Sequence, residues 1–386
     1  MSATPIALDA AAPAACGVPR AAVGGHIAMV LHDLRGGGAE RACLRLAQGM
    51  VEAGRPVELI LVQGAGAYLS DVPPGVRLTV LDLPRVSRAG TALARHFRRT
   101  RPAAVLSALT HMNIVTIMAA RLSGLPLQVV VSERNQISCK AREARGAWQR
   151  ALYRAVPLAY RAADRVVAVS GGVAGDLARF GRLPDRKIRV IHNPVFDPAI
   201  EARAAEAPQH PWFTADGPPI VLACGRLHRQ KGFDVLLKAF ARARAQLECR
   251  LVILGEGGER QHLKEQADRI GLAYDIDMPG FCANPFALMA RAGAFVLSSR
   301  WEGFPNVLVE AMACGAPVIA TDCPSGPREI LDGIAPLVPV DDDAALGAAL
   351  IAALRRRPDT AATRLRAQRF SIAAAAKQYL EALERS

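Results

Sequence analysis

The chain has 386 residues, of which 51% are apolar and 5% aromatic, and a formal net charge of +13. This length exceeds one ordinary hydrophobic core and favours two domains, while the composition excludes disordered and fibrous classes. No uncharged apolar run reaches the roughly 18 residues that a membrane-spanning helix needs, so the sequence predicts no such helix.

The N-terminus and the cysteines add little chemistry. Residues 1–24 are rich in alanine and proline, with an acid at Asp9 and without the basic start and apolar run of a secretory signal. We expect a loose tail there. The eight cysteines form no C-x-x-C pair and have no histidine at metal-ligand spacing, which favours small buried side chains in a reducing cytosol over zinc or disulfides.

The first half of the chain alternates between strand-like and helical patterns. An apolar run at 26–34 leads into the glycine cluster GGGAE and then into a helical pattern that ends near Gly54. Further apolar runs follow at 56–63, 103–109, 127–133 and 164–170, with helical patterns around 113–124 and up to Gly181. Strands that alternate with helices predict a parallel sheet covered on both faces.

A proline-rich stretch then separates two halves. A last apolar run at 188–195 leads into prolines 194, 198, 208, 211, 218 and 219, which mark a linker at 198–218. The strand and helix pattern restarts at 219–225 and continues to 337–340, and an amphipathic helix is expected at about 371–385.

These patterns predict an α/β protein of two doubly wound domains, at 25–197 and 219–370. The C-terminal segment 371–386 can pack on either domain, including the N-terminal one. In such folds the ligand binds in the cleft that faces the carboxyl ends of the strands.

Two glycine clusters, at 36–38 and 255–258, precede helical patterns. A glycine loop at a helix N-terminus offers free N–H groups and the positive end of a dipole, which favour phosphate. Neither cluster matches a dinucleotide or P-loop signature, and tight packing between strand and helix explains such glycines at least as well.

The loop GRLHRQKG, residues 225–232, carries Arg226 and Lys231 between an expected strand and an expected helix. The planar fork of the arginine and the compact charge of the lysine suit a diphosphate. A solvated surface loop explains the same residues equally well.

The segment RWEGFPNVLVEAMACG predicts a short helix with one acid before it and one inside it. Pro305 fits the first helical position and Gly315 the residue just past the end, so that Glu302 precedes the helix and Glu310 lies within it. Such an arrangement suits a polyol attached to a phosphate, since the helix N-terminus accepts the anion and the acids accept hydrogen bonds from hydroxyls. Periodicity alone instead favours a core helix with a solvent-facing glutamate.

Several motifs stand in order through the second half: GRLHRQKG at 225–232, LGEGGER at 254–260, GF at 280–281, E-x7-E at 302–310 and EAMACGAPVIATDCPSGPREIL at 310–331. With them the chain resembles the family 4 retaining glycosyltransferases of the GT-B fold, in which two Rossmann-like domains face a cleft. GGGAER at 36–41, SALTHMNI at 107–114 and VSERN at 131–135 resemble the N-terminal domain of bacterial members that build lipopolysaccharide, exopolysaccharide or lipid-linked glycans.

The resemblance implies roles for the acids and the cations. Glu310 would bind the ribose hydroxyls of the nucleotide, and Glu302 would contact hydroxyls of the donor sugar. Arg226 and Lys231 would hold the diphosphate. The backbone around the helix start would complete that site, with N–H groups from Phe304, Asn306 and Val307 and with Pro305 lacking a donor of its own.

Four further positions follow from the resemblance. The backbone of Phe281 would contact the base, Gly37 and Gly38 would form a flexible loop beside donor and acceptor, and His111 would be the active-site histidine of some members. The resemblance implies no metal ion and no other cofactor. The D-I-D at 275–277 imitates the metal-binding motif of the other major transferase fold but stands before a strand.

The implied reaction moves a hexose or N-acetylhexosamine from a UDP-sugar to a glycan or lipid-linked acceptor with retention of configuration. CPSGPREIL, residues 323–331, resembles N-acetylhexosamine transferases, those for N-acetylgalactosamine among them. A UDP-GlcNAc 2-epimerase would share the two-lobed fold, but the E-x7-E segment favours a transferase. A dinucleotide-dependent oxidoreductase lacks its glycine fingerprint.

All of the net positive charge lies in residues 1–200. Arginines cluster at 85–101, and the segment 138–165 mixes basic residues with Trp148, Tyr153 and Tyr160. This content suits an anionic membrane surface and hence a protein at the cytoplasmic face of the cell membrane. A solvated arginine-rich face is an equal alternative, and no nucleic-acid motif accompanies the charge, so nucleic acid is not expected as a partner.

Overall fold

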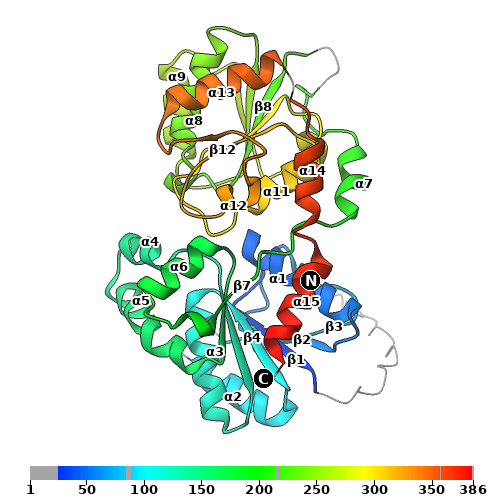
Figure 1. Ribbon diagram of the computed structural model, residues 1–386, viewed down its shortest axis with the longest axis vertical. Helices are drawn as coiled ribbons and strands as arrows, with labels where there is room; N and C mark the ends of the chain where they lie inside the picture. Colours follow the sequence, from blue (N-terminus) through cyan, green and yellow to red (C-terminus); the bar gives the residue numbers. More distant parts are fainter. Residues whose placement is uncertain (1–24, 84–87, 214–216, 357, 385–386) are drawn as a thin grey trace, which may run out of the picture.

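The computed structural model describes residues 25–83, 88–213, 217–356 and 358–384. They form two lobes, each a twisted parallel sheet flanked by helices, stacked along the long axis of the molecule (Figure 1). The expected tail at 1–24 lies outside the described residues, as does Arg85 of the arginine cluster.

The N-terminal lobe contains a seven-stranded sheet in the order β3-β2-β1-β4-β5-β6-β7. Every pairing is parallel. The strands are β1 (Ile27–Leu31), β2 (Val57–Leu61), β3 (Val76–Val80), β4 (Ala104–Ala108), β5 (Gln128–Glu133), β6 (Arg165–Ala168) and β7 (Ile188–Val190). Because helices cover both faces, the central strands are buried along their whole length and are mostly apolar, with Glu58 of β2 and Ser107 of β4 as buried polar exceptions.

Among the described residues, the chain up to β7 supplies this lobe with six α-helices: α1 (Gly38–Glu52), α2 (Ala89–Thr100), α3 (Thr110–Ser123), α4 (Ile137–Glu143), α5 (Ala147–Ala159) and α6 (Gly171–Arg179). α6 begins at Ser170, whose Oγ accepts a hydrogen bond from the N–H of Val173 and so satisfies one of the free donors of the first turn. α3 ends at Gly124, which adopts a left-handed conformation.

The C-terminal lobe repeats the same plan with six parallel strands in the order β10-β9-β8-β11-β12-β13. The strands are β8 (Ile220–Cys224), β9 (Arg250–Leu254), β10 (Ile276–Gly280), β11 (Ala294–Leu297), β12 (Val318–Thr321) and β13 (Leu337–Val338). The helices are α8 (Phe233–Arg244), α9 (Arg260–Arg269), α10 (Pro285–Met289), α11 (Asn306–Ala313), α12 (Pro327–Leu331), α13 (Asp343–Arg355) and α14 (Ala361–Gln368). In both sheets the strand order reverses beside the first strand, at β1 and at β8. Open α/β sheets bind their ligands at the carboxyl ends of the strands at this switch point. Two doubly wound domains are thus confirmed.

The chain passes between the lobes twice, and the two passages lie side by side. The N–H groups of Val195 and Phe196 both donate to the carbonyl of Phe370 over 2.9 Å. The expected linker at 198–218 is not wholly irregular: it includes α7 (Ala199–Ala205), which packs on α10 and α11. An alanine-rich segment between prolines can form two helical turns when a neighbouring lobe covers its apolar face.

The last helix, α15 (Ile372–Leu383), packs on α1 of the N-terminal lobe (Figure 1). Gly49 permits the close approach, since a Cβ there would lie 2.7 Å from Cγ2 of Ile372 and 2.9 Å from Cβ of Ala376. Tyr379 is fully buried, and its hydroxyl lies 2.9 Å from Oγ of Ser132 in β5. The C-terminal helix is therefore part of the N-terminal core.

Candidate active site

The loops at the carboxyl ends of the two sheets contact one another between the lobes. On the N-terminal side they are the glycine loop before α1 and the start of α6, and on the C-terminal side they are the loop before α11 and the start of α12. Polar groups from both lobes meet there, and Gly37, Glu302, Phe304 and Pro305 of the predicted site lie on these loops.

Both glutamates of the E-x7-E segment are buried, with 5% and 4% of their surface exposed for Glu302 and Glu310. The solvent-facing alternative for Glu310 is therefore wrong. Oε1 of Glu302 accepts hydrogen bonds from Nζ of Lys231 and Oγ of Ser299, each over 2.6 Å. Oε1 of Glu310 accepts one from Nη1 of Arg45, on α1 of the other lobe, over 3.2 Å. Each buried carboxylate thus has one cation beside it.

The helix between them begins one residue later than expected. α11 starts at Asn306, and Pro305 precedes it with non-helical backbone angles, whereas the sequence predicted Pro305 as the first helical residue. A proline is accepted at either position because the first N–H groups of a helix have no intrahelical partner. Gly315 follows the end with a φ of 75°, as predicted.

The two predicted cations differ in their surroundings. The stem of Lys231 lies against Gly225, where a Cβ would be 3.1 Å from its Cε, and its ammonium group reaches Glu302. Arg226 is exposed and pairs with no acid among the described residues. Arg226 is therefore a cation available to an anion that enters beside Lys231.

The two glycine clusters have different explanations. The carbonyl of Gly38 accepts a hydrogen bond from Nδ2 of Asn306 over 2.9 Å, so that the loop with Gly37 lies against the tip of α11. In the second cluster a Cβ at Gly255 or Gly257 would lie 2.1 or 2.2 Å from a backbone carbonyl of the 225–227 loop. Close backbone packing explains that cluster.

His111 lies in the first turn of α3, where its ring meets that of His32 edge-on with centroids 5.6 Å apart. Burial lowers the pKa of His111 below its usual 6.5, and His32 lowers it further. His111 is thus a neutral hydrogen-bonding group at neutral pH. His32, which follows β1, was not predicted; its Nε2 is buried and has no hydrogen-bond partner among the described residues.

The two predicted phenylalanines are placed differently. Phe281 is 70% exposed directly after Gly280, at the end of β10. Phe304 is buried, and its ring packs on the rings of His192 and Phe370 with centroids 5.3 Å apart in both cases. The side chain of Phe304 therefore belongs to the contact between the lobes, which leaves only its backbone to a ligand. Val307, in the first turn of α11, is half-buried.

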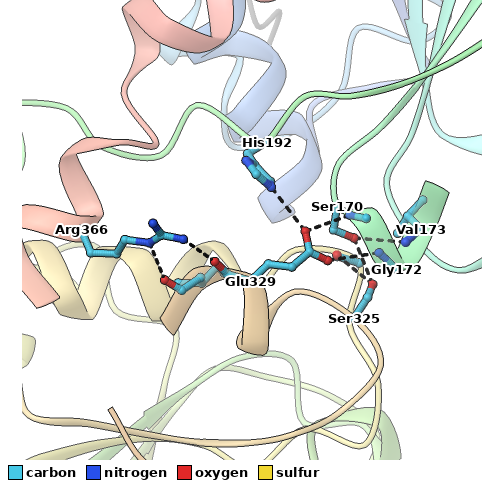
Figure 2. A network of polar contacts seen from close by, with 10 residues as sticks. Ser170, Gly172, Val173, His192, Ser325, Glu329 and Arg366 are labelled. Atoms are coloured by element: carbon cyan, nitrogen blue, oxygen red, sulfur yellow. Dashed lines mark hydrogen bonds and ion pairs between the residues drawn. The ribbon is translucent and has the colours of Figure 1, made fainter. Parts of the chain in front are cut away.

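A second carboxylate crosses between the lobes. Glu329, on α12, accepts hydrogen bonds from the N–H groups of Gly171 and Gly172, over 2.8 and 3.1 Å, at the start of α6 (Figure 2). Nε2 of His192 lies 3.4 Å from the same carboxylate. Burial alone would raise the pKa of Glu329, but the hydrogen bonds from His192 and the two amides more than offset it and hold the pKa below its usual value.

The surroundings of Glu329 are tightly packed. A Cβ at Gly172 would lie 2.1 Å from Cβ of Ser325, so that only glycine fits. Oγ of Ser325 lies 3.0 Å from Oγ of Ser170, the residue that caps α6. Arg366 of α14 donates to the backbone carbonyl of Glu329 over 2.8 Å (Figure 2). The hydrogen bonds of Glu329 and Ser325 thus hold α12 and the loop before it against the start of α6, and Arg366 ties α12 to α14.

A buried arginine that the sequence did not single out reaches the same region. Arg134 follows β5, is 5% exposed, and donates from Nη1 to Oδ1 of Asn193. Nδ2 of Asn193 donates in turn to Oδ1 of Asn306 over 2.8 Å. The only sign of Arg134 in the sequence was its place in the VSERN motif, to which no role was assigned.

The D-I-D segment is occupied by structural contacts. Asp275 forms an ion pair with Arg244 over 3.3 Å, and Asp277 pairs with His210 over 3.1 Å. Within the described ranges no group of three or more His, Cys, Asp or Glu side chains is placed to hold a metal ion.

The seven cysteines in these ranges are all free. A search of the same ranges for a helix of membrane-spanning length and hydrophobicity finds none.

Two family models match the chain, one for each lobe. "Glycosyltransferase Family 4" matches residues 36–196, and "Glycosyl transferases group 1" matches residues 218–356. Together the two matches extend over most of both sheets and include the glycine loop, Arg226, Lys231 and the E-x7-E segment.

Curated relatives are bacterial and archaeal glycosyltransferases. N-acetylgalactosamine-N,N'-diacetylbacillosaminyl-diphospho-undecaprenol 4-alpha-N-acetylgalactosaminyltransferase of Campylobacter jejuni is 33% identical over 190 residues, 49% of this chain and 50% of the relative. Lipopolysaccharide 1,6-galactosyltransferase of Salmonella typhimurium is 30% identical over 175 residues, 44% of this chain and 46% of the relative. The chain spans about half the length of these relatives.

Solved structures share the whole architecture. Anabaena HepE in complex with UDP-glucose superposes with a TM-score of 0.79 at 20% identity, over 93% of this chain and 99% of that one. The lipopolysaccharide outer core galactosyltransferase WaaB superposes with a TM-score of 0.69 at 19% identity, over 92% and 98%. At such identities the likeness establishes the GT-B fold. With this fold and a matching family model on each lobe, the N-terminal lobe is a Glycosyltransferase Family 4 domain and the C-terminal lobe is a Glycosyl transferases group 1 domain.

Proposed function

We propose that this chain is a retaining glycosyltransferase that moves a hexose or N-acetylhexosamine from a UDP-sugar to a lipid-linked or cell-surface glycan. The observation that carries the proposal is the ion pair of the half-buried Lys231 with the buried Glu302, in the segment that leads into α11, with Arg226 on the same loop as Lys231 and unpaired in the described structure. A cationic group and a carboxylate side by side suit the two ends of a sugar diphosphate.

Breaking the anomeric C–O bond leaves negative charge on the departing diphosphate, and catalysis requires that charge to be met by groups already in place. Arg226, Lys231 and the free N–H groups at the start of α11 supply such groups without a metal ion. Glu302 then accepts hydrogen bonds from hydroxyls of the donor sugar, and Glu310 accepts them from the ribose.

Neither glutamate suits a covalent double displacement. Retaining glycosidases place two carboxyl groups about 5 Å apart across the bond that breaks. Here Glu302 is held by Lys231 and Ser299, and Glu310 is held by Arg45. We infer a substitution on one face of the sugar, in which the leaving phosphate oxygen takes the proton of the acceptor hydroxyl. His111, neutral at pH 7, hydrogen-bonds a sugar hydroxyl.

The proposed acceptor rests on the names of relatives, and the proposed location rests on the exposed face of α5. The Campylobacter relative is named for an undecaprenol-linked acceptor, and two others are named for lipopolysaccharide synthesis. On α5, Trp148 and Leu158 are 76% and 78% exposed, near the exposed Arg150 and Arg154. Exposed apolar side chains beside arginines suit an anionic bilayer. We therefore place the protein at the inner face of the cell membrane.

The test combines a panel of UDP-sugars with a polyprenyl-linked glycan acceptor. Transfer releases free UDP and lengthens the glycan, with the anomeric configuration of the donor retained in the product. A 2-epimerase would convert the UDP-sugar without any acceptor. Epimerisation in the absence of acceptor, or no turnover with any donor, would overturn the proposal. A thermal-shift screen of nucleotide sugars chooses the donors, since a ligand that binds only the folded state raises stability.

A further inference from the structure

α1 of the N-terminal lobe lies against α11 of the C-terminal lobe (Figure 1). Two polar contacts join them: Nδ2 of Asn306 donates to the carbonyl of Gly38 over 2.9 Å, and Nη1 of Arg45 donates to Oε1 of Glu310 over 3.2 Å. Asn306 and Glu310 are four residues apart and share one face of α11. Gly38 and Arg45 are two turns apart on α1. The two helices are therefore joined at two defined points, one at the start of α1 and one two turns further along it.

The Arg45–Glu310 pair is shielded from water. The side chains of Arg45 and Glu310 are 12% and 5% exposed. No other cation among the described residues is within ion-pair distance of Glu310, although 265 residues separate the two partners in the chain. A buried carboxylate that loses its one cation is strongly disfavoured, so Arg45 determines how Glu310 sits.

Arg45 contacts only one of the two carboxylate oxygens of Glu310. Oε1 of Glu310 accepts the hydrogen bond from Arg45, and Oε2 accepts none from any residue that the structure describes. A carboxylate held through one oxygen is restrained in its rotation and keeps its other oxygen open to a second donor. That free oxygen is where a hydroxyl of a ligand can donate.

We propose that Arg45 is a positioning residue that orients Glu310 towards the ribose hydroxyls of the nucleotide and so sets the preference for a ribonucleotide. The inference rests on the proposed function. Because Arg45 comes from the N-terminal lobe, the ribose site is complete only when the two lobes are together. Donor recognition by the C-terminal lobe thus depends on a side chain of the N-terminal lobe.

A neighbouring arginine on the same helix is placed differently. Arg41 lies one turn before Arg45, and its guanidinium stands over the ring of Tyr68, 4.8 Å from the centroid. It forms no ion pair with an acid in the described part of the chain. The contact with Glu310 is therefore specific to Arg45 and is not a general effect of a basic helix.

The experiment compares the affinity of each variant for a ribonucleotide and for its 2′,3′-dideoxy analogue. Whichever of UDP, GDP and ADP binds the wild-type protein best is used, and affinities are measured by calorimetry. The variants are Arg45→Met, which keeps the length of the side chain, Arg45→Lys, Glu310→Gln and the double variant. Arg55→Met is the matched control, because Arg55 is in the same lobe but pairs with the exposed Glu384 over 3.7 Å.

The ratio of the two affinities isolates the ribose contact, because a general loss of stability changes both affinities alike. We expect Arg45→Met to lower the ratio about tenfold or more, as for the loss of one charged hydrogen bond, and Arg45→Lys to restore most of it. Glu310→Gln should lower the ratio too, and the double variant should be no worse than Glu310→Gln alone. Arg55→Met should keep the wild-type ratio.

Two failures are distinguishable. A wild-type ratio retained in Arg45→Met, or additive losses in the double variant, would overturn the role of Arg45 and leave the proposed function standing. A wild-type protein that binds the dideoxy analogue equally well would likewise overturn the role of Arg45 alone. A wild-type protein that binds none of the three nucleotides would overturn both.

Discussion

Asn193, where the chain first leaves the N-terminal lobe, donates a hydrogen bond from Nδ2 to Oδ1 of Asn306, the first residue of α11, over 2.8 Å. Oδ1 of Asn193 accepts a hydrogen bond from the buried Arg134, and Nδ2 of Asn306 donates one to the carbonyl of Gly38. One series of hydrogen bonds thus joins the end of β5, the passage between the lobes, the tip of α11 and the glycine loop.

Two substitutions at Asn193 distinguish the effect of its hydrogen bond with Arg134 from that of its hydrogen bond with Asn306. Asn193→Ala leaves a buried guanidinium without this acceptor and should lower the free energy of unfolding by about 1.5–3 kcal/mol. Asn193→Asp still accepts from Arg134 but cannot donate to Asn306, so we expect near wild-type stability with slower turnover. Chemical denaturation and a transfer assay measure the two effects. Wild-type turnover in Asn193→Asp would show that the contact with Asn306 does not position α11.

Lys231 and Arg226 are expected to stabilise the departing diphosphate. Removing either charge, by Lys231→Ala or Arg226→Ala, should slow transfer by about 10²- to 10³-fold, as for the loss of one preorganised donor. Steady-state kinetics with the preferred UDP-sugar measure the change. Lys264→Ala removes an exposed lysine of α9 in the same lobe and should leave the rate unchanged. A double Arg226 and Lys231 variant with full activity would contradict the proposed role.

Transfer should not depend on a divalent ion. We expect the rate in EDTA to equal the rate in magnesium or manganese, because the proposed leaving-group contacts come from side chains and a helix start. Asp277→Asn should likewise keep the wild-type rate, since Asp277 pairs with His210 on the outside of the lobe. Activity that disappears in EDTA and returns with manganese would refute this expectation.

The contact between α12 and α6 should weaken in acid. The folded pKa of Glu329 is below its usual 4.5, so its contribution to stability is complete above pH 4.5 and is lost as the pH falls through the folded value. Glu329→Gln should therefore lower the unfolding free energy by about 1 kcal/mol at pH 7, and by progressively less below pH 4.5. Thermal unfolding of the wild-type protein and of Glu329→Gln between pH 3 and pH 8, with about one scan per pH unit, measures the difference in stability. Glu381→Gln, which breaks the exposed pair with Arg189, is the control and should show little effect.

The basic, partly aromatic face of α5 should bind anionic vesicles. We expect the protein to sediment with phosphatidylglycerol vesicles at low salt and to be released at high salt. Trp148→Ala combined with Arg150→Glu and Arg154→Glu should abolish sedimentation. Lys264→Glu with Arg269→Glu makes the same change of charge on the exposed side of α9 and should preserve it. Sedimentation that is indifferent to lipid charge would exclude the interface.

The fold followed from the sequence wherever strands are buried on both faces. β1, β2 and β4 are mostly apolar runs because helices cover both sides of them, and such runs are visible without a structure. β3 was missed, since it is the edge strand and mixes exposed with half-buried residues. α7 was missed because prolines on either side suggested a linker, and its helix is stabilised by packing on the C-terminal lobe.

The site was predictable only where its residues stand together in a motif. Glu302 and Glu310 come from one segment, and the resemblance selected them despite a periodicity that favoured a solvent-facing glutamate. Arg45, Asn193 and His32 come from separate elements of the other lobe. Sequence patterns report which face of a helix is apolar, but they do not report which helix it meets, so the partners of Glu310 and Asn306 emerged only from the structure.

The position of α15 bears on how the protein comes to be folded. The N-terminal lobe leaves the ribosome first, yet its core stays open beside Gly49 and Ser132 until residues 372–383 have been synthesised and have returned past the whole second lobe. A nascent chain that stops before Ile372 would therefore expose an unfilled groove along α1, and it would depend on chaperones until its final helix arrives.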